Sequence, residues 1–177
     1  MKLSLMAPLA MFAALAVALA VGLNREDAEE LPSVFINQPS PEIRVGVLGG
    51  NAPYRAELLS APGLKLVNFW ASWCPPCRAE HPNLMQLANE GWTIIGINKS
   101  DEQANALGFL RELGNPYAAV GADPDGRASI EWGVYGLPET FLVDGAGHIR
   151  LRHPGPVTKR VWQSRFVPII AALQAGG

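Results

Sequence analysis

The chain has 177 residues, 49% of them hydrophobic, and a formal net charge of −2. This length suits one domain of average size preceded by a leader segment. The near-neutral charge provides no basic cluster of the kind that binds nucleic acid, so we expect no nucleic-acid partner. The sequence also contains no internal repeat and no low-complexity tract, which excludes solenoid and fibrous architectures.

The leader is an uncharged segment over residues 3–23, between Lys2 and Arg25. About 20 apolar residues, at roughly 1.5 Å each, match the hydrocarbon core of a bilayer. We therefore expect residues 1–23 to form one transmembrane anchor with its N-terminus inside, since acids beside Arg25 offset its charge. A signal peptide cleaved at the Ala-Leu-Ala site of residues 18–20 is an alternative that also exports the domain. A buried core helix is a further alternative, but the sequence supplies no partners to cover it.

Residues 24–40, rich in acids and prolines, predict a tether, and residues 41–177 predict a single domain. Apolar runs predict strands at 65–71, 92–98, 118–120, 140–143 and 149–152. Amphipathic stretches predict helices at 75–89, 102–113 and 127–132, and a last helix capped by Thr158. The Asp-Gly-Ala-Gly segment at 144–147 predicts a hairpin. Strand–helix alternation that ends in a hairpin and a helix indicates α/β layers around a mixed sheet.

The two cysteines, Cys74 and Cys77, lie three positions apart. A bridge across so short a loop constrains the unfolded chain little, so we expect the pair to serve chemistry rather than stability. Cys74 precedes the predicted helix, where unpaired N–H groups and the helix dipole favour a thiolate. Cys77, one turn further on, can resolve a mixed disulfide. Pro75 and Pro76 suit a first helical turn and fix the spacing of the sulfurs.

Other uses of a Cys-x-x-Cys pair fit the sequence less well. A zinc site needs two more ligands, and the nearest histidine is His81. Covalent haem attachment needs a histidine directly after the second cysteine, where Arg78 stands. A copper site with His81, His148 or His153 remains an alternative. We expect a redox-active disulfide that uses no metal and no cofactor.

Longer runs of sequence carry a family resemblance. Residues 67–82 (VNFWASWCPPCRAEHP) resemble the active-site strand and helix of thioredoxin-like proteins. Residues 133–155, which begin GVYGLPETF, resemble the CcmG/DsbE family, the periplasmic branch devoted to cytochrome c maturation. Residues 96–117 and 32–43 are also similar to that family, so the resemblance covers nearly the whole chain. The GVYGLPET run is its most specific part.

The resemblance implies a thioredoxin-like α/β fold with an N-terminal hairpin extension and a central insertion. It implies a reductant that acts on the haem-binding thiols of apocytochrome c, directly or through a partner thiol protein. It also implies an inner-membrane protein with a periplasmic catalytic domain, re-reduced by a membrane electron donor of the DsbD/CcdA kind. A general periplasmic disulfide reductase and a metal- or haem-handling chaperone are the alternatives.

By position, the resemblance makes Cys74 the nucleophile and Cys77 the resolving thiol. It places Leu137 and Pro138 in a cis-proline loop beside the active site, with Tyr135 in the same groove-lining motif. A cis bond there is plausible because X–Pro bonds carry a small cis penalty.

Two acidic residues, Glu80 and Glu139, match positions that flank the active site in this family. Glu80 is three residues after Cys77, so it can exchange protons with that sulfur; a solvated helix charge is the alternative. Glu139 tunes specificity or is simply exposed. Asn68 stands where many thioredoxins have a buried aspartate, and an amide cannot accept a proton, which again favours Glu80. Trp73 shields the sulfur or serves packing alone.

Overall fold

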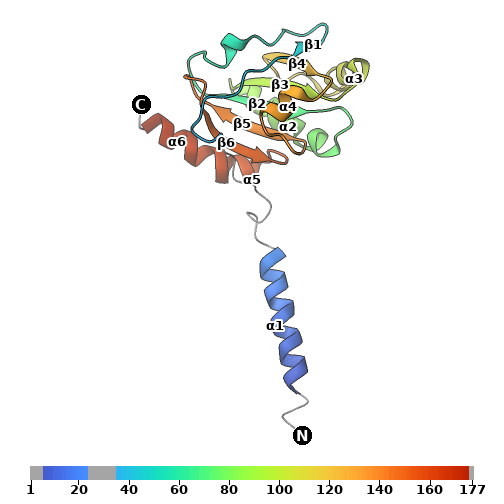
Figure 1. Cartoon of the computed structure of the whole chain (residues 1–177), viewed down its shortest axis with the longest axis vertical. Coiled ribbons are helices and arrows are strands. Elements are labelled where there is room, and N and C mark those ends of the chain that lie inside the picture. The colour runs from blue at the N-terminus through green and yellow to red at the C-terminus, as the bar shows by residue number, and fades with distance from the viewer. Residues whose placement is uncertain (1–5, 24–34, 176–177) are drawn as a thin grey trace. The chain divides into compact units, whose positions relative to one another are not determined.

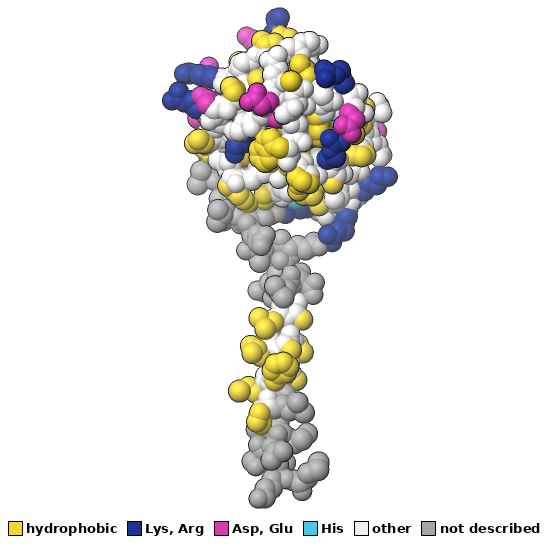
Figure 2. Space-filling model, turned by 90° about the vertical axis from the view of Figure 1, so that its right-hand side faces the viewer, with side chains coloured by type: hydrophobic (Ala, Val, Ile, Leu, Met, Phe, Trp, Pro, Cys, Tyr) yellow, Lys and Arg dark blue, Asp and Glu magenta, His cyan; other side chains and the backbone are white. Residues whose placement is uncertain are grey.

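The chain divides into two units, residues 1–32 and 33–177, of which the computed structural model describes residues 6–23 and 35–175. The first unit contains helix α1 (Met6–Leu23; Figure 1). Its described large apolar side chains, such as Phe12 and Val17, are exposed, and Figure 2 shows hydrophobic side chains along this unit. Within the described ranges, no helix is both long and apolar enough to be assigned as a membrane span. The start of the predicted anchor and most of the predicted tether lie outside the described residues.

The second unit is built on a mixed sheet in the order β1-β4-β3-β2-β5-β6. Its strands are β1 (Gly46–Val47), β2 (Lys65–Trp70), β3 (Thr93–Lys99), β4 (Ala119–Asp123), β5 (Glu139–Val143) and β6 (Ile149–Pro154). β2, β3 and β4 run parallel, whereas β5 pairs antiparallel with both β2 and β6. The sheet therefore places the carboxyl end of β2 beside the amino end of β5, which is where the site lies.

Helices cover the sheet on both faces (Figure 1). They are α2 (Pro75–Asn89), α3 (Gln103–Leu113), α4 (Arg127–Glu131) and a C-terminal helix of three joined parts, α5 (Lys159–Val161), η3 (Trp162–Phe166) and α6 (Val167–Ala175). A short 3₁₀ turn, η2 (Ala56–Leu58), precedes β2. α2, α3 and the C-terminal helix pack on one face with Leu66 and Trp70 of β2. α4 and the segment before β2 cover the other, with Val67 and Phe69. Successive β2 side chains thus alternate between two cores, and Asn68 faces α2.

The predicted strands and helices are confirmed, with boundaries that differ from the expected ones by at most three residues. Thr158 caps the C-terminal helix by accepting a hydrogen bond from the Val161 N–H at 3.2 Å. Gly114 ends α3 at φ +89°, a left-handed conformation that glycine adopts without strain. The apolar stripe of the C-terminal helix contributes Phe166 and Ile170 to the core, as its spacing predicts.

The N-terminal part of the domain differs from expectation. The implied hairpin is absent from the described residues: β1 is two residues long and pairs with β4. Prolines and glycines interrupt this stretch, and Pro39 and Pro53 make only isolated bridges. Residues 37–40, predicted as tether, hydrogen-bond to Gly147 and Ile149, so the folded domain begins before residue 41. Between β3 and β5 lie α3, β4 and α4, where a central insertion is expected.

Candidate active site

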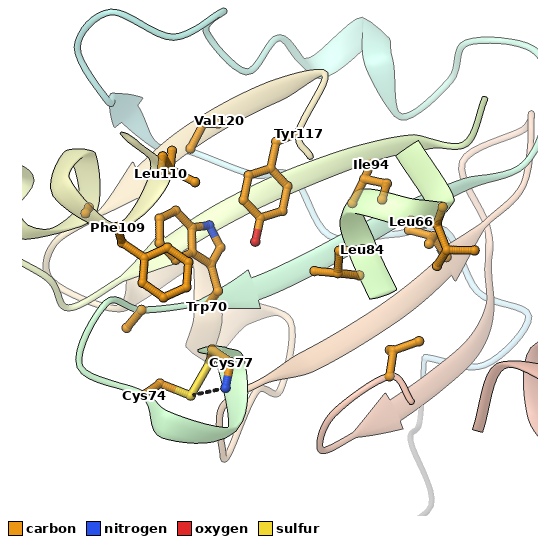
Figure 3. Close-up of a cluster of buried hydrophobic side chains, with 14 of the residues drawn as sticks. Leu66, Trp70, Cys74, Cys77, Leu84, Ile94, Phe109, Leu110, Tyr117 and Val120 are labelled. Atoms are coloured by element: carbon orange, nitrogen blue, oxygen red, sulfur yellow. Dashed lines mark hydrogen bonds between the residues drawn. A yellow bond between two sulfur atoms is a disulfide. The ribbon is translucent and has the colours of Figure 1, made fainter. Parts of the chain in front are cut away.

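Cys74 and Cys77 form a disulfide at the N-terminus of α2, with their Cα atoms 5.3 Å apart (Figure 3). Cys74 is the N-cap residue, and its Sγ accepts a hydrogen bond from the Cys77 N–H at 3.1 Å. Pro75 and Pro76 occupy the first two helical positions, where a missing N–H leaves no hydrogen bond unmade. The position of Cys74 therefore supplies both an N–H donor and the positive end of the helix dipole to a thiolate.

Both cysteines are largely buried, since Cys74 is 3% exposed and Cys77 is 2% exposed. They belong to the core cluster that includes Trp70, Phe109 and Leu84 (Figure 3). A low-dielectric environment of this kind strengthens the interaction of a sulfur anion with the helix N-terminus. Trp73, by contrast, is 58% exposed, and its indole Nε1 donates to the carbonyl of Ser100 at 2.9 Å. Trp73 therefore lies on the surface beside the disulfide and does not pack in the core.

Glu80 is buried, at 1% exposure, so the interpretation as a solvated helix charge is wrong. Its Oε1 accepts a hydrogen bond from Asn68 Nδ2 at 2.9 Å, and its Oε2 accepts one from the Val157 N–H at 2.8 Å. Desolvation raises the pKa of Glu80 to about 7, against the lowering effect of these two hydrogen bonds. A carboxyl group with this pKa can take up and release a proton near neutral pH.

Asn68 links Glu80 to two further side chains. Tyr117 Oη donates to Asn68 Oδ1 at 2.9 Å, and Asn68 Nδ2 also donates to Thr140 Oγ1 at 3.0 Å. The tyrosine hydroxyl therefore fixes the orientation of the amide, because it can donate only to the carbonyl side. Burial, then the charge of Glu80, raises the pKa of Tyr117 well above its ordinary value, which keeps the hydroxyl protonated. Sequence reasoning missed Tyr117 and Thr140, which are distant in the chain and carry no local signal.

The loop before β5 lies at the same edge of the sheet as the cysteines. Phe69 of β2 pairs with Glu139 of β5, so Pro138 lies level with the end of β2. The Leu137–Pro138 peptide bond is cis, as expected, and the Pro138 carbonyl accepts a hydrogen bond from the Gly155 N–H at 2.8 Å. Leu137 packs against both core clusters.

Glu139 is fully buried and forms an ion pair with Arg152 of β6, so the alternative that it is exposed is wrong. Arg152 also donates to the Gly133 carbonyl at 2.6 Å and lies over the ring of Tyr135, 4.7 Å from its centroid. Desolvation raises the pKa of Glu139, opposed first by Arg152. Tyr135 itself is 51% exposed. One partly buried arginine, Arg152, which sequence reasoning missed, thus contacts both ends of the 133–139 loop.

The histidines proposed as copper ligands have other contacts. The Nε2 atom of His81 lies 3.0 Å from the Gly114 carbonyl oxygen, and its ring contacts Phe109 edge to face. His148 Nδ1 lies 3.7 Å from Asp144 Oδ1, and the His153 ring contacts Phe166 edge to face. Across residues 6–23 and 35–175, no group of three or more His, Cys, Asp or Glu side chains is placed to hold a metal ion.

The fold and the Cys74–Cys77 site define a thioredoxin-like thiol:disulfide oxidoreductase. The redoxin family matches residues 38–166. The thioredoxin domain of a thiol-disulfide oxidoreductase from Bacteroides vulgatus superposes with a TM-score of 0.63 at 22% identity, covering 77% of this chain and 99% of that domain. This structural likeness supports the fold.

Curated relatives narrow the assignment. The chain is 46% identical over 161 residues to the thiol:disulfide interchange protein DsbE homolog of Paracoccus denitrificans, covering 91% of this chain and 89% of the relative. It is 43% identical over 170 residues to thiol:disulfide interchange protein DsbE of Escherichia coli, covering 93% and 92%. The chain therefore belongs to the CcmG/DsbE family of thiol:disulfide oxidoreductases.

Proposed function

We propose that this protein is a membrane-anchored periplasmic dithiol reductase of cytochrome c maturation, acting on apocytochrome c thiols or on a partner thiol protein. The observation that carries the redox part is the placement of Cys74 Sγ at the N-terminus of α2, 3.1 Å from the Cys77 N–H. The cytochrome c part is supported by the GVYGLPET run at residues 133–140, which resembles the family's most specific segment.

The reaction begins with the reduced protein. The Cys74 thiolate attacks one sulfur of a substrate disulfide, so that a Cys74–substrate bond forms and the other substrate sulfur leaves as a thiolate. Cys77 then loses its proton and attacks Cys74 Sγ. The Cys74–Cys77 bond forms and the second substrate sulfur leaves, which completes a two-electron reduction of the substrate. The redox couple is the cysteine pair itself, with no further cofactor.

Glu80 is the proposed acceptor of the Cys77 proton. It follows Cys77 by three residues on the same face of α2. Its pKa of about 7 lies near neutral pH, where a carboxylate can accept this proton and later release it. Asn68 and Tyr117 orient the groups around its carboxylate. The loop at 133–139, held by Arg152, supplies the other wall of the substrate site, with Tyr135 exposed for contact.

The anchor and the electron donor complete the proposal. Residues 3–23 carry no charge, and the described large apolar side chains of α1 are exposed, so a bilayer would cover them. We place the catalytic domain in the periplasm, where a membrane donor of the DsbD/CcdA kind returns two electrons to the oxidised pair. Retention of the full chain in membranes after alkaline carbonate washing tests the anchor, and its release by the wash rejects it.

A substrate assay tests the reductase function. The reduced full chain is mixed with two substrates: an oxidised peptide carrying the haem-binding Cys-x-x-Cys-His motif, and oxidised insulin. We expect rapid reduction of the peptide, slower reduction of insulin, and none of either by the Cys74→Ser variant. Equal rates on both substrates would favour a general periplasmic reductase. Metal or haem bound by the anaerobically purified protein would favour the chaperone alternative.

A further inference from the structure

The segment directly before Cys74 is held by a loop that follows β3. Asp101 Oδ2 accepts a hydrogen bond from the Ser72 N–H at 2.6 Å, and its Oδ1 accepts one from Ser72 Oγ at 2.8 Å. The neighbouring Ser100 carbonyl accepts from the Trp73 indole at 2.9 Å. Two adjacent loop residues, Ser100 and Asp101, therefore hydrogen-bond to the two residues that precede Cys74.

The loop itself is held in an unusual conformation. Ser100 has φ +47°, in the left-handed region that non-glycine residues rarely adopt. Its N–H donates to the Asp123 carbonyl at 2.9 Å, and Asn98 Nδ2 donates to Asp101 Oδ2 at 3.0 Å. A backbone held in a sparsely populated region by its surroundings is a known mark of functional positions.

We propose that Ser100 and Asp101 form a clamp that positions Cys74, making Asp101 a positioning residue for the redox reaction. This inference rests on the proposed role of Cys74 as nucleophile. The turn before α2 contains the Cys74 N–H to Ala71 carbonyl bond at 3.3 Å, and Pro75 and Pro76 have no N–H to add. Release of Ser72 therefore lets Cys74 Sγ move away from the Cys77 N–H, and the thiolate loses that donor.

The charge of Asp101 and its positioning role have effects of opposite sign. Removal of a nearby negative charge alone favours the Cys74 thiolate and raises its reactivity. Loss of the clamp takes Cys74 Sγ away from the Cys77 N–H donor and lowers the reactivity of Cys74. Glu102, the exposed next residue, offers a matched control: Glu102→Gln removes a charge from the same loop without touching a hydrogen bond to Ser72.

The test is the rate of Cys74 alkylation by iodoacetamide in the reduced full chain, followed across pH. We expect Asp101→Ala, which removes both oxygens that accept hydrogen bonds from Ser72, to lower the rate at neutral pH by about five-fold and to move the pH midpoint upward. Five-fold is roughly the net contribution of one hydrogen bond, that from the Cys77 N–H to Cys74 Sγ. Ser72→Ala keeps the hydrogen bond from the residue 72 N–H to Asp101. It should therefore change the alkylation rate and the pH midpoint in the same directions, but by less. Ser72→Ala also keeps the inference testable if Asp101→Ala does not fold.

Four results would count against the clamp. An Asp101→Ala profile equal to that of Glu102→Gln overturns it, and so does an Asp101→Ala rate that rises. An unchanged Ser72→Ala profile, with Asp101→Ala unfolded, also overturns it. Wild-type Cys74 that reacts no faster than Cys77 overturns the proposed role of Cys74 itself, and the clamp with it.

Discussion

Asn68 Nδ2 lies 2.9 Å from Glu80 Oε1, so an amide on β2 donates to a buried carboxyl group on α2. An acid at position 68 would place a second negative charge against Glu80. The amide instead supplies a neutral donor, and Tyr117 fixes which side of it faces Glu80. The surroundings of Glu80 therefore hold a single carboxyl group on α2, one turn after Cys77, and desolvation raises its pKa to about 7.

Glu80 should make the stability of the domain depend on pH. Its pKa is about 7 when folded against an ordinary 4.5, so the unfolded chain loses this proton first. The contribution of Glu80 to the free energy of unfolding is fully present below about pH 4.5. It falls by up to about 3 kcal/mol as the pH rises to about 7. Glu80→Gln does not titrate and should lack the fall. Urea unfolding of both proteins across this range measures it, and parallel profiles would contradict it.

Tyr117→Phe should leave the buried Asn68 carbonyl without its tyrosine donor and destabilise the domain by about 1–2 kcal/mol. Tyr54→Phe is the matched control, because Tyr54 Oη is buried and has no hydrogen-bond partner among the described residues. Tyr54→Phe should therefore lower the free energy of unfolding only slightly. Urea unfolding of the two variants compares them, and equal losses would mean that the Tyr117 hydroxyl contributes nothing specific.

Arg152→Leu should leave Glu139 buried without its ion-pair partner and cost about 3–5 kcal/mol. The Glu139→Gln, Arg152→Leu double variant should be more stable than the sum of the single losses predicts, because neither charge is then left unpaired. Arg44→Leu, which breaks an exposed pair with Glu42, is the control and should matter little. A double-mutant cycle by denaturant unfolding measures the coupling; additive losses would disagree with this account.

Gly96→Ala should destabilise the domain by about 1–3 kcal/mol, since a Cβ at this position would lie 2.7 Å from Tyr117 Cγ. The buried ring would have to shift, which also weakens its bond to Asn68. Gly108→Ala in α3 is the contrast: its nearest neighbour is Arg111 Nη2 at 3.8 Å, so helix propensity should stabilise it by up to about 1 kcal/mol. Thermal unfolding distinguishes the two, and equal shifts would argue against the contact.

The sequence predicts the elements of the fold well because their signals are local. The apolar run at 65–71 and the Cys-Pro-Pro-Cys segment define strand, turn and helix start without any distant contact. The position of Cys74 at a helix N-terminus follows from them. The cis-proline loop at Leu137–Pro138 came from family resemblance, and the structure places it level with the end of β2.

The surroundings of the cysteines could not be predicted in the same way. Glu80 is buried because Val157, 77 residues later, closes over it and donates a backbone hydrogen bond. Tyr117 reaches Asn68 across 49 residues. Such contacts depend on strand order and register, which hydrophobic periodicity does not determine. The expectation of an N-terminal hairpin is wrong for a local reason: prolines and glycines interrupt this stretch, so β1 is only two residues long.

The central claim is that Cys74 attacks and Cys77 resolves. The most direct measurement is intact mass of the reduced Cys77→Ser and Cys74→Ser variants after mixing with an oxidised Cys-x-x-Cys-His peptide. We expect the Cys77→Ser variant to accumulate a mixed disulfide through Cys74, because its resolving thiol is missing, and the Cys74→Ser variant to remain unmodified. A mixed disulfide that forms preferentially on Cys77 of the Cys74→Ser variant would contradict it.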